Sequence, residues 1–382
     1  YRMEMAVKVG ENYMSEVYRV HCDYIKPSDS IETLHNWTVI VKSMPCIGMR
    51  ETISEFDLFG HEVEMLTNVI PAYSKFTDDT FAAECFLGSE EPFQFILLED
   101  LTLSNFTSAN RKNGLDYDHC KLVMKKLGKF HASSLLFANE NIESVKTKFE
   151  SRVFHPNHDN KHVEKFFSNG YLALLNTIVD KRDTFSPVLI EKIKNVEQSF
   201  VKKMADGFQR QIKVNVITHG DLWVANIMFK YDQKTGKPID VIFVDFQIGF
   251  YGSPGTDINY FFNSSLQTDV YRTKRDDLIK IYYSGFHEVL SKNEYKNIPT
   301  LKDIFNEYKQ KLFHGFVSSV SILPLASVEK TFEETGEGKQ LDGIMGGDET
   351  SEFRQSTYSN VNFLNRVKYV LEYLDREKVF DL

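Results

Sequence analysis

The stretch "VITHGDLWVANIMF", residues 216–229, poses the central question of this sequence. A short β-forming run ends in His219 and Gly220. Asp221 comes next, and Asn226 follows five positions later. Aspartate and asparagine after a strand are common turn residues, because their side chains bond to the nearby backbone. The same side chains can also act as a general base and as an oxygen ligand for Mg²⁺.

A second strand favours the chemical interpretation. "VIFVDFQ" carries Asp245, 19 residues after Asn226. Phosphoryl transfer from ATP needs a base for the accepting hydroxyl and oxygen ligands for Mg²⁺. Asp221 fits the base, and Asn226 and Asp245 fit the ligands. His219 is expected to hold the loop backbone, since Mg²⁺ prefers oxygen. Chance is a poor explanation for Asp221, Asn226 and Asp245 occurring together at this spacing.

Two weaker motifs lie upstream. "GENYMS", residues 10–15, sits at the tip of an expected hairpin, where its amides and the Ser15 hydroxyl can cover phosphates. A plain β-turn is the alternative, and the favoured one for this motif alone. Lys42 lies in the strand "WTVIVKSM" and Glu62 on the next helix, a pair that can hold the α- and β-phosphates. A solvated edge lysine is the alternative here.

A third motif, "LLEDL" at residues 97–101, stands where strand character stops and helices begin. A hinge there would place backbone groups against the adenine ring of ATP, and a strand ending in an acidic turn is the alternative. The candidate nucleotide-binding residues are thus Gly10, Asn12, Ser15, Lys42, Leu98, Glu99, Asp100 and Leu101.

The chain is expected to divide into a nucleotide-binding lobe, residues 1–100, and a catalytic and substrate-binding lobe, residues 101–382. The first is β-rich with one helix over 54–70. The second is mainly helical, with a β-turn-β block over 212–246 and an acidic surface loop over 333–352. Apolar periodicity predicts its helices near 117–137, 161–180, 188–206, 268–291, 301–320 and 361–376. The fold class is therefore α+β.

Bulk properties exclude several function classes. The chain has 382 residues and a net charge of −9, which argues against nucleic acid or an anionic membrane as a partner. No apolar run approaches the roughly 20 residues that span a bilayer, and the N-terminus carries no signal-peptide core. Four scattered cysteines without a Cys-x-x-Cys pair indicate thiols in a cytoplasmic protein. The first residue is Tyr1 rather than methionine, which leaves open whether residues precede it.

The motifs "HGDLWVANIMF" and "FVDFQIGFYGSPGTDINYF" together resemble the insect ecdysteroid kinase-like family, within the choline kinase and aminoglycoside phosphotransferase group. The likeness extends to "GENYMSEVYRV", "FGHEVEMLTNVIP", "LLEDL", "LGKFHASS" and "VLEYLDREKVFDL", so it covers nearly the whole chain. The resemblance implies a two-lobed, protein-kinase-like fold that uses ATP and Mg²⁺ to phosphorylate a small-molecule hydroxyl.

The resemblance also implies roles for single residues. Lys42 and Glu62 would anchor phosphates, Asp221 would be the base, and Asn226 and Asp245 would bind magnesium. It further implies that Asp257, in "SPGTD", braces the catalytic loop from the next helix.

Two residues depart from the protein-kinase pattern. Gly220 stands where protein kinases usually have arginine, so a phosphorylated activation loop has no obvious anchor. Gln247 replaces the glycine of Asp-Phe-Gly, and no Ala-Pro-Glu motif follows. A protein substrate is therefore not expected.

The leading hypothesis is a kinase for the hydroxyl of an apolar small molecule, with an ecdysteroid first among the substrates. The chain has 31 phenylalanines, and Phe250 and Tyr251 are the candidates for the substrate pocket. A choline- or aminoglycoside-type kinase and a detoxifying kinase of other alcohols remain alternatives. A catalytically inactive binding protein is disfavoured, because the lysine, the base and both expected metal ligands are present.

Overall fold

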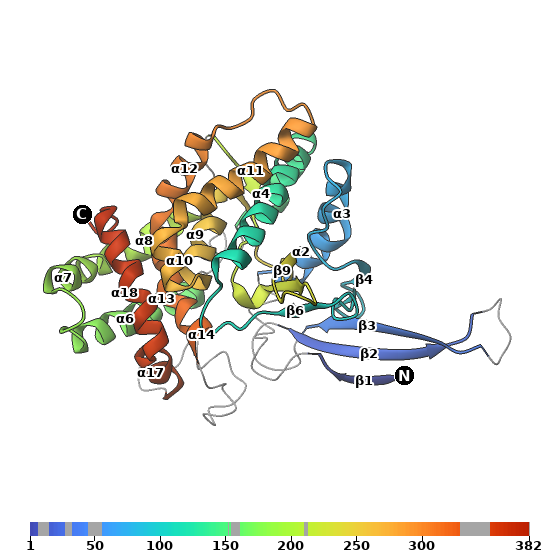
Figure 1. Ribbon diagram of the computed structural model, residues 1–382, viewed down its shortest axis with the longest axis horizontal. Helices are drawn as coiled ribbons and strands as arrows, with labels where there is room; N and C mark the ends of the chain where they lie inside the picture. Colours follow the sequence, from blue (N-terminus) through green and yellow to red (C-terminus); the bar gives the residue numbers. More distant parts are fainter. Residues whose placement is uncertain are drawn as a thin grey trace.

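The computed structural model describes residues 1–6, 15–26, 33–44, 56–151, 153, 161–209, 213–328 and 352–381. Its N-terminal part is a five-stranded antiparallel sheet with strand order β1-β2-β3-β5-β4. The strands are β1 (Arg2–Met5), β2 (Glu16–Tyr24), β3 (His35–Ser43), β4 (Cys85–Ser89) and β5 (Phe95–Glu99). In Figure 1 the long strands β2 and β3 extend away from the helical part.

The register of this sheet places Lys42 in its interior. Lys42 on β3 pairs with Val17 of β2 on one side and with Ile96 of β5 on the other. Only 4% of its surface is exposed. The interpretation of Lys42 as a solvated edge residue is therefore wrong.

The helix between β3 and β4 is less regular than its sequence pattern predicts. α2 (Leu58–Glu64) passes into a π-helical segment, η1 (Met65–Val69), and then into α3 (Ile70–Ala72) and the 3₁₀ turn η2 (Tyr73–Lys75). Phe59 and Leu66 lie in the core as expected. Pro71 has no N–H to continue the helical hydrogen bonds, so the helix changes its winding around it.

The C-terminal part is mainly helical. Its first elements are β6 (Phe106–Ser108), α4 (Tyr117–Glu140), α5 (Ile142–Lys148), α6 (Lys161–Asp180), α7 (Pro187–Asn195), η3 (Glu197–Ser199) and α8 (Phe200–Gly207). The middle holds β7 (Val216–Ile217), η4 (Val224–Asn226), β8 (Ile227–Tyr231), β9 (Pro238–Phe243), β10 (Tyr251–Gly252), α9 (Pro254–Ser265), α10 (Thr268–Thr273) and α11 (Arg275–Lys292). The last elements are α12 (Leu301–Gln310), α13 (Leu312–Ser321), α14 (Leu323–Ser327), α17 (Glu352–Ser359) and α18 (Val361–Arg376).

Two long helices, α4 and α11, lie side by side (Figure 1). The predicted apolar face of α4 is buried, with Val123, Leu127 and Phe130 fully covered. Their close approach needs a glycine at position 128, because a Cβ there would lie 2.1 Å from the Tyr282 carbonyl oxygen.

Helix α9 runs through the centre of the helical part. All twelve of its residues are buried, and α12 and α13 pack against it. Its start is fixed by the Ser253 cap, whose side chain accepts from Gly255 N, and by Pro254 in the first turn. Because α9 is packed on every side, its side chains have fixed positions.

Two small sheets position the loops around residues 218–226 and 244–250. β7 pairs with β10, and β6, β8 and β9 form a three-stranded sheet. Asp221 thus follows β7, Asn226 precedes β8, and Asp245 follows β9.

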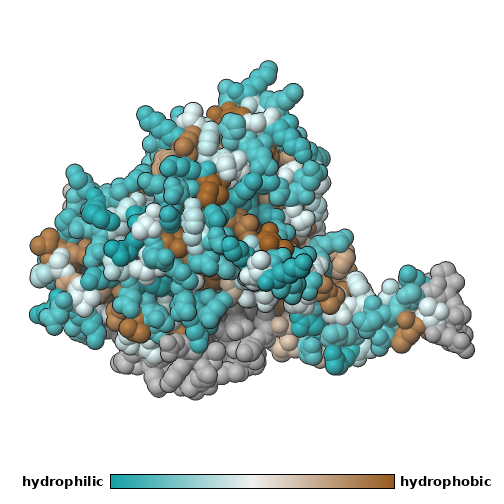
Figure 2. Space-filling view, viewed as in Figure 1, coloured by the Kyte–Doolittle hydropathy of each residue, from teal (hydrophilic) through white to brown (hydrophobic). Residues whose placement is uncertain are grey.

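The structure confirms the α+β class, with a sheet first and helices after it. α6 and α18 match their predicted bounds, whereas 188–206, 268–291 and 301–320 each contain a break between helices. The expected surface loop lies outside the described residues, except that Glu352 begins α17. In the described part of the chain no helix is both long and apolar enough to cross a bilayer. The face in Figure 2 is mostly hydrophilic, with apolar residues scattered over it.

Candidate functional site

A cavity of about 420 Å³ lies where the N-terminal sheet meets the β8–β9 hairpin. Lys42 and Glu62 reach it from the N-terminal part, and Asn226 and Asp245 reach it from the other side. Apolar side chains, among them Ile40 and Met228, form much of the remaining wall. The cavity therefore combines an apolar surface with a few convergent charges, which is typical of a ligand site.

Lys42 joins two acidic residues on this wall. Its Nζ lies 2.7 Å from Glu62 Oε2 and also contacts the Asp245 carboxylate. Burial by itself lowers the pKa of Lys42, but the charges of Asp245 and Glu62 outweigh it and raise that pKa. Lys42 is therefore a fixed positive charge in the cavity, held in place by two carboxylates.

Asp221 is held by two side chains. The Tyr260 hydroxyl donates to Asp221 Oδ1 at 2.5 Å, and Asn226 Nδ2 donates to Oδ2 at 2.9 Å. Burial raises the pKa of Asp221 to about 6, the nearby Asp245 charge adds to the rise, and the two donors oppose it. The carboxylate is thus ionised at neutral pH and more basic than an exposed aspartate.

The loop before Asp221 is fixed through its backbone. Asp257 accepts from His219 N at 2.7 Å and from Gly220 N at 2.9 Å. Burial favours a raised pKa for Asp257, but the hydrogen bond and charge of His131 outweigh it and lower that pKa. An ionised Asp257 carboxylate therefore accepts both backbone hydrogen bonds.

Gly220 and His219 adapt the loop to its surroundings. Gly220 has φ +83°, and a Cβ there would lie 2.3 Å from the Ile248 carbonyl oxygen. No other residue fits such a position without strain. His219 Nε2 lies 3.0 Å from the Val244 carbonyl oxygen, and burial lowers the pKa of the His219 ring. A neutral histidine therefore ties the loop to the residue between β9 and Asp245.

Asn226 and Asp245 are brought together by the hairpin. Val244 N donates to the Asn226 carbonyl oxygen at 3.0 Å, next to the Ile227–Phe243 pair of β8 and β9. Asp245 has φ +66°, a conformation that is uncommon outside glycine and concentrated at functional sites. Both side chains line the cavity.

These donors suit a hard cation. Among the described residues no group of three or more His, Cys, Asp or Glu is placed to hold a metal. The expected metal ligands at the cavity are instead the Asp245 carboxylate and the Asn226 amide. Mg²⁺ characteristically takes few protein ligands and completes its shell with water and phosphate oxygens. The chemistry of this donor set fits Mg²⁺ better than Zn²⁺.

Comparison with known proteins decides the family, because the model of the ecdysteroid kinase-like family matches residues 9–295. The chain belongs to the ecdysteroid kinase-like family. The description of this family indicates a kinase-like protein. No curated protein matches the sequence.

Solved structures similar to this kinase-family chain have low sequence identity. Plasmodium vivax ethanolamine kinase is 15% identical, with 83% of this chain and 76% of that chain covered and a TM-score of 0.39. A choline/ethanolamine kinase family protein from Mesorhizobium loti is 9% identical, with 94% and 92% covered and a TM-score of 0.38. The GDP complex of wild-type aminoglycoside 2'-phosphotransferase-IIIa is 12% identical, with 94% and 93% covered and a TM-score of 0.41.

The other predicted site residues fall into three groups. Gly10 and Asn12 lie outside the described residues, and Ser15 is buried immediately before β2. The four residues of the expected hinge all line the cavity, namely Leu98, Glu99, Asp100 and Leu101. The substrate-pocket candidates do not line it.

Phe250 and Tyr251 occupy a different place in this ecdysteroid kinase-like protein. Phe250 is 2% exposed and packs against Phe208, with ring centroids 5.3 Å apart. Tyr251 is half-buried, and its N–H donates to the Phe149 carbonyl oxygen. Their part in substrate binding stays a prediction.

Sequence reasoning missed three residues of the site. Arg19 lines the cavity and bonds to Asp100 at 2.6 Å, His131 contacts Asp257, and Tyr260 contacts Asp221. All three lie within motifs that carry the family resemblance, and the spacing of Tyr260 gives a further signal. Tyr260 lies three positions after Asp257, which puts both on one face of a helix.

Proposed function

We propose that this protein transfers the γ-phosphate of ATP to a hydroxyl of an apolar small-molecule alcohol, with an ecdysteroid as the first candidate. One observation carries the proposal. Lys42 is separated from Asp245 by 203 positions, yet the two form an ion pair on the wall of the cavity that Asn226 also lines. Bringing a lysine and oxygen donors to one cavity is what phosphoryl transfer requires.

On the nucleotide side, charge neutralisation is the main task. The Lys42 ammonium would bind phosphate oxygens, and Glu62 would keep the ammonium directed into the cavity. Asn226 and Asp245 would hold Mg²⁺, which when bound neutralises charge on the phosphate oxygens. The hinge residues would contact the base of the nucleotide.

On the acceptor side, Asp221 would take the proton of the attacking hydroxyl. Its raised pKa, about 6, makes it a better proton acceptor than an exposed aspartate while leaving it ionised at pH 7. The Tyr260 and Asn226 bonds limit its rotation, so the base would meet the hydroxyl in a fixed orientation.

Family membership and the many phenylalanines support an apolar alcohol as the substrate. The same two observations are equally compatible with plant or xenobiotic alcohols as substrates. A choline- or aminoglycoside-type substrate would need an acidic or aromatic cage for its cation, and it remains the alternative that the substrate panel tests. An inactive binding protein is least supported, since the lysine and acidic partners of the site are in place.

The test is an incubation with γ-labelled ATP, magnesium and a panel of ecdysteroids, other sterols, plant alcohols, choline, ethanolamine and aminoglycosides. We expect label on the steroid or another apolar alcohol, and a labelling rate about 10³-fold lower with Asp221→Asn under the same conditions. The exposed Asp118, 46% accessible on α4, offers a matched control, and Asp118→Asn should label as the wild type does. Label on choline or an aminoglycoside alone would contradict the substrate class, and no label on any acceptor would contradict the activity.

A further inference from the structure

One face of helix α9 holds the loop 219–226 at three successive places. Asp257 receives the amides of His219 and Gly220. One turn later, the Tyr260 hydroxyl donates to the Asp221 carboxylate. At the end of the helix, Ser265 Oγ accepts from Val224 N at 3.0 Å. The helix therefore fixes the loop backbone before and after Asp221, and it fixes the Asp221 side chain itself.

The middle contact differs from the other two because it acts on the reacting group. The Tyr260–Asp221 bond, at 2.5 Å, is a charge-assisted O–H···O⁻ contact, which is among the stronger hydrogen bonds in proteins. Burial, together with the Asp221 charge, raises the pKa of Tyr260 well above its usual value, so the phenol keeps its proton and stays a donor.

The tyrosine is itself held in place. It is 8% exposed, its ring lies 6.1 Å from that of His314, and its backbone lies within a helix that is buried along its whole length. Tyr260 therefore has little freedom to follow a moving carboxylate. A carboxylate bound to it must keep the orientation that α9 dictates.

We infer that Tyr260 is a positioning residue for the reaction, and that its hydroxyl holds the Asp221 carboxylate in the orientation that accepts the proton of the substrate alcohol. This inference rests on the proposed function of Asp221 as the base. Its opposite is a purely structural tyrosine, whose buried hydroxyl needs some partner and finds one in the nearest acceptor.

Tyr260→Phe removes the hydroxyl and keeps the ring. We expect kcat to fall by about 10- to 100-fold, because the base loses one of its two fixed contacts. The dissociation constant for ATP, measured by calorimetry, should stay within about twofold, since Tyr260 is not among the residues that line the nucleotide cavity. If the role of Tyr260 were purely structural, Tyr260→Phe would lower the thermal stability, reduce kcat and weaken ATP binding together.

Tyr271→Phe is the matched control. Tyr271, on α10, is also buried, and its hydroxyl donates to Asn263 Oδ1 of α9 at 3.0 Å, so the same chemical change removes a buried tyrosine hydroxyl that bonds to a residue other than the base. We expect kcat of this variant to equal that of the wild type.

Two further measurements separate positioning from structure. In an Asp221→Asn background, Tyr260→Phe should cause no additional fall in the residual rate, because a residue that acts through another loses its effect with it. Replacing Tyr260 by 4-aminophenylalanine, which restores a donor at the same place, should recover most of kcat, whereas 4-methylphenylalanine should not.

The outcomes distinguish this inference from the proposed function. A wild type that phosphorylates an alcohol, with an unchanged kcat in Tyr260→Phe, overturns the positioning role and leaves the function standing. Additive effects in the double variant overturn it too. A wild type that binds ATP and phosphorylates no acceptor contradicts the proposed function, and the positioning role falls with it.

Discussion

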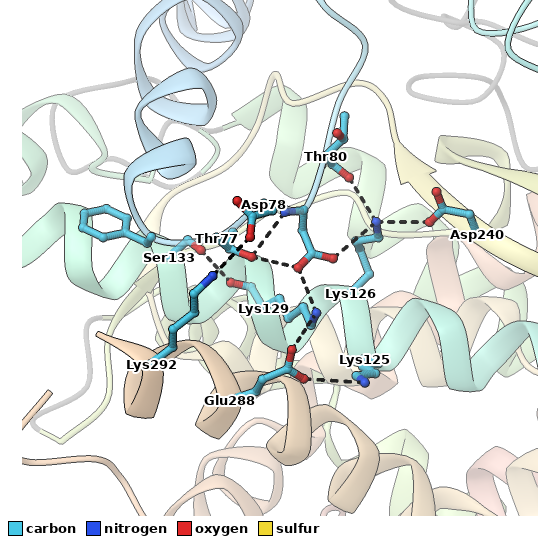
Figure 3. Close-up of polar contacts among 12 residues, drawn as sticks. Thr77, Asp78, Thr80, Lys125, Lys126, Lys129, Ser133, Asp240, Glu288 and Lys292 are labelled. Carbon is cyan, nitrogen blue, oxygen red and sulfur yellow. Dashed lines mark hydrogen bonds and ion pairs between the residues drawn. The ribbon is translucent and has the colours of Figure 1, made fainter. Parts of the chain in front are cut away.

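Two polar networks of this molecule contain lysine and acidic side chains, one at the candidate site and the other at the protein surface. The buried cluster consists of Lys42, Glu62, Asp221, Asn226, Asp245 and Tyr260, together with Asp257, which holds the loop before Asp221. The surface network joins the segment after η2 to α4, β9 and α11 (Figure 3), and consists of Asp78, Asp79, Lys125, Lys126, Lys129, Asp240, Glu288 and Lys292.

The difference lies in solvent exposure. The Lys42, Glu62 and Asp245 side chains are 5%, 2% and 24% exposed. Those of the surface network range from 11% for Lys126 to 97% for Asp78. Removing one partner of a buried pair leaves an uncompensated charge, which costs about 3–5 kcal/mol. An exposed pair contributes about 0–1 kcal/mol, because water and salt screen it. Replacing a whole buried pair by apolar residues of similar volume is often neutral or stabilising, so net stability alone does not explain why the cluster is charged.

The largest expected effect of a single change is in turnover. Asp221→Asn removes the base but keeps the size of the side chain, so kcat should fall by about 10³-fold while the ATP dissociation constant stays nearly constant. Steady-state kinetics and calorimetry measure the two quantities. Weaker ATP binding at an unchanged kcat would show that Asp221 serves the nucleotide rather than the proton transfer.

A second change tests the metal side of the cluster. Asp245→Asn replaces a charged oxygen ligand by a neutral amide, so the Mg²⁺ concentration for half-maximal activity should rise by about tenfold or more. Lys42 keeps its bond to Glu62, so the fold should persist. Activity titrated against Mg²⁺ is the measurement. An unchanged Mg²⁺ dependence would remove Asp245 from the ligand set.

A third change compares stability inside and outside the cluster. Asp257→Asn puts an amide NH₂ against a backbone N–H of the loop or against His131, so one buried donor loses its acceptor, at a cost of about 1–3 kcal/mol. Urea unfolding should show this loss, and kcat should fall with it. The control is Asp78→Asn on the surface, where less than about 0.5 kcal/mol is expected. Equal losses at the two positions would abolish the distinction between the networks.

Much of the architecture could be predicted from local pattern. Helices α6 and α18 have one apolar and one polar face, so their periodicity predicted their bounds. Helix α9 is buried on every side, and a helix without a polar face has no such period, so no pattern predicted it. Only the resemblance implied a helix at Asp257.

The breaks and contacts that escaped prediction depend on tertiary structure. Residues 301–320 divide at Lys311, whose Nζ is buried and donates to the Gly207 carbonyl oxygen at 2.9 Å, an interaction with a distant helix. The Tyr260–Asp221 bond joins residues 39 positions apart. Motif spacing indicated which residues carry chemistry, but not which buried neighbour orients them.

The smallest expected effect belongs to the surface network and is the sharpest test of the comparison. Glu288 bonds to Lys129 at 2.9 Å and to Lys125 at 3.5 Å, and all three side chains contact solvent. Glu288→Gln should cost about 0–1 kcal/mol in urea unfolding, and the loss should shrink in high salt.

The same variant also has an expected pH dependence. Because Lys129 lowers the pKa of Glu288, the contribution of Glu288 to stability is present above the unfolded-state pKa and is lost as pH falls through the folded-state pKa. The difference in unfolding free energy between Glu288→Gln and the wild type should therefore vanish in acid. The kcat of the variant should equal that of the wild type at every salt concentration. A loss of several kcal/mol, or one that salt does not reduce, would mean that this network is a structural clamp rather than a screened surface.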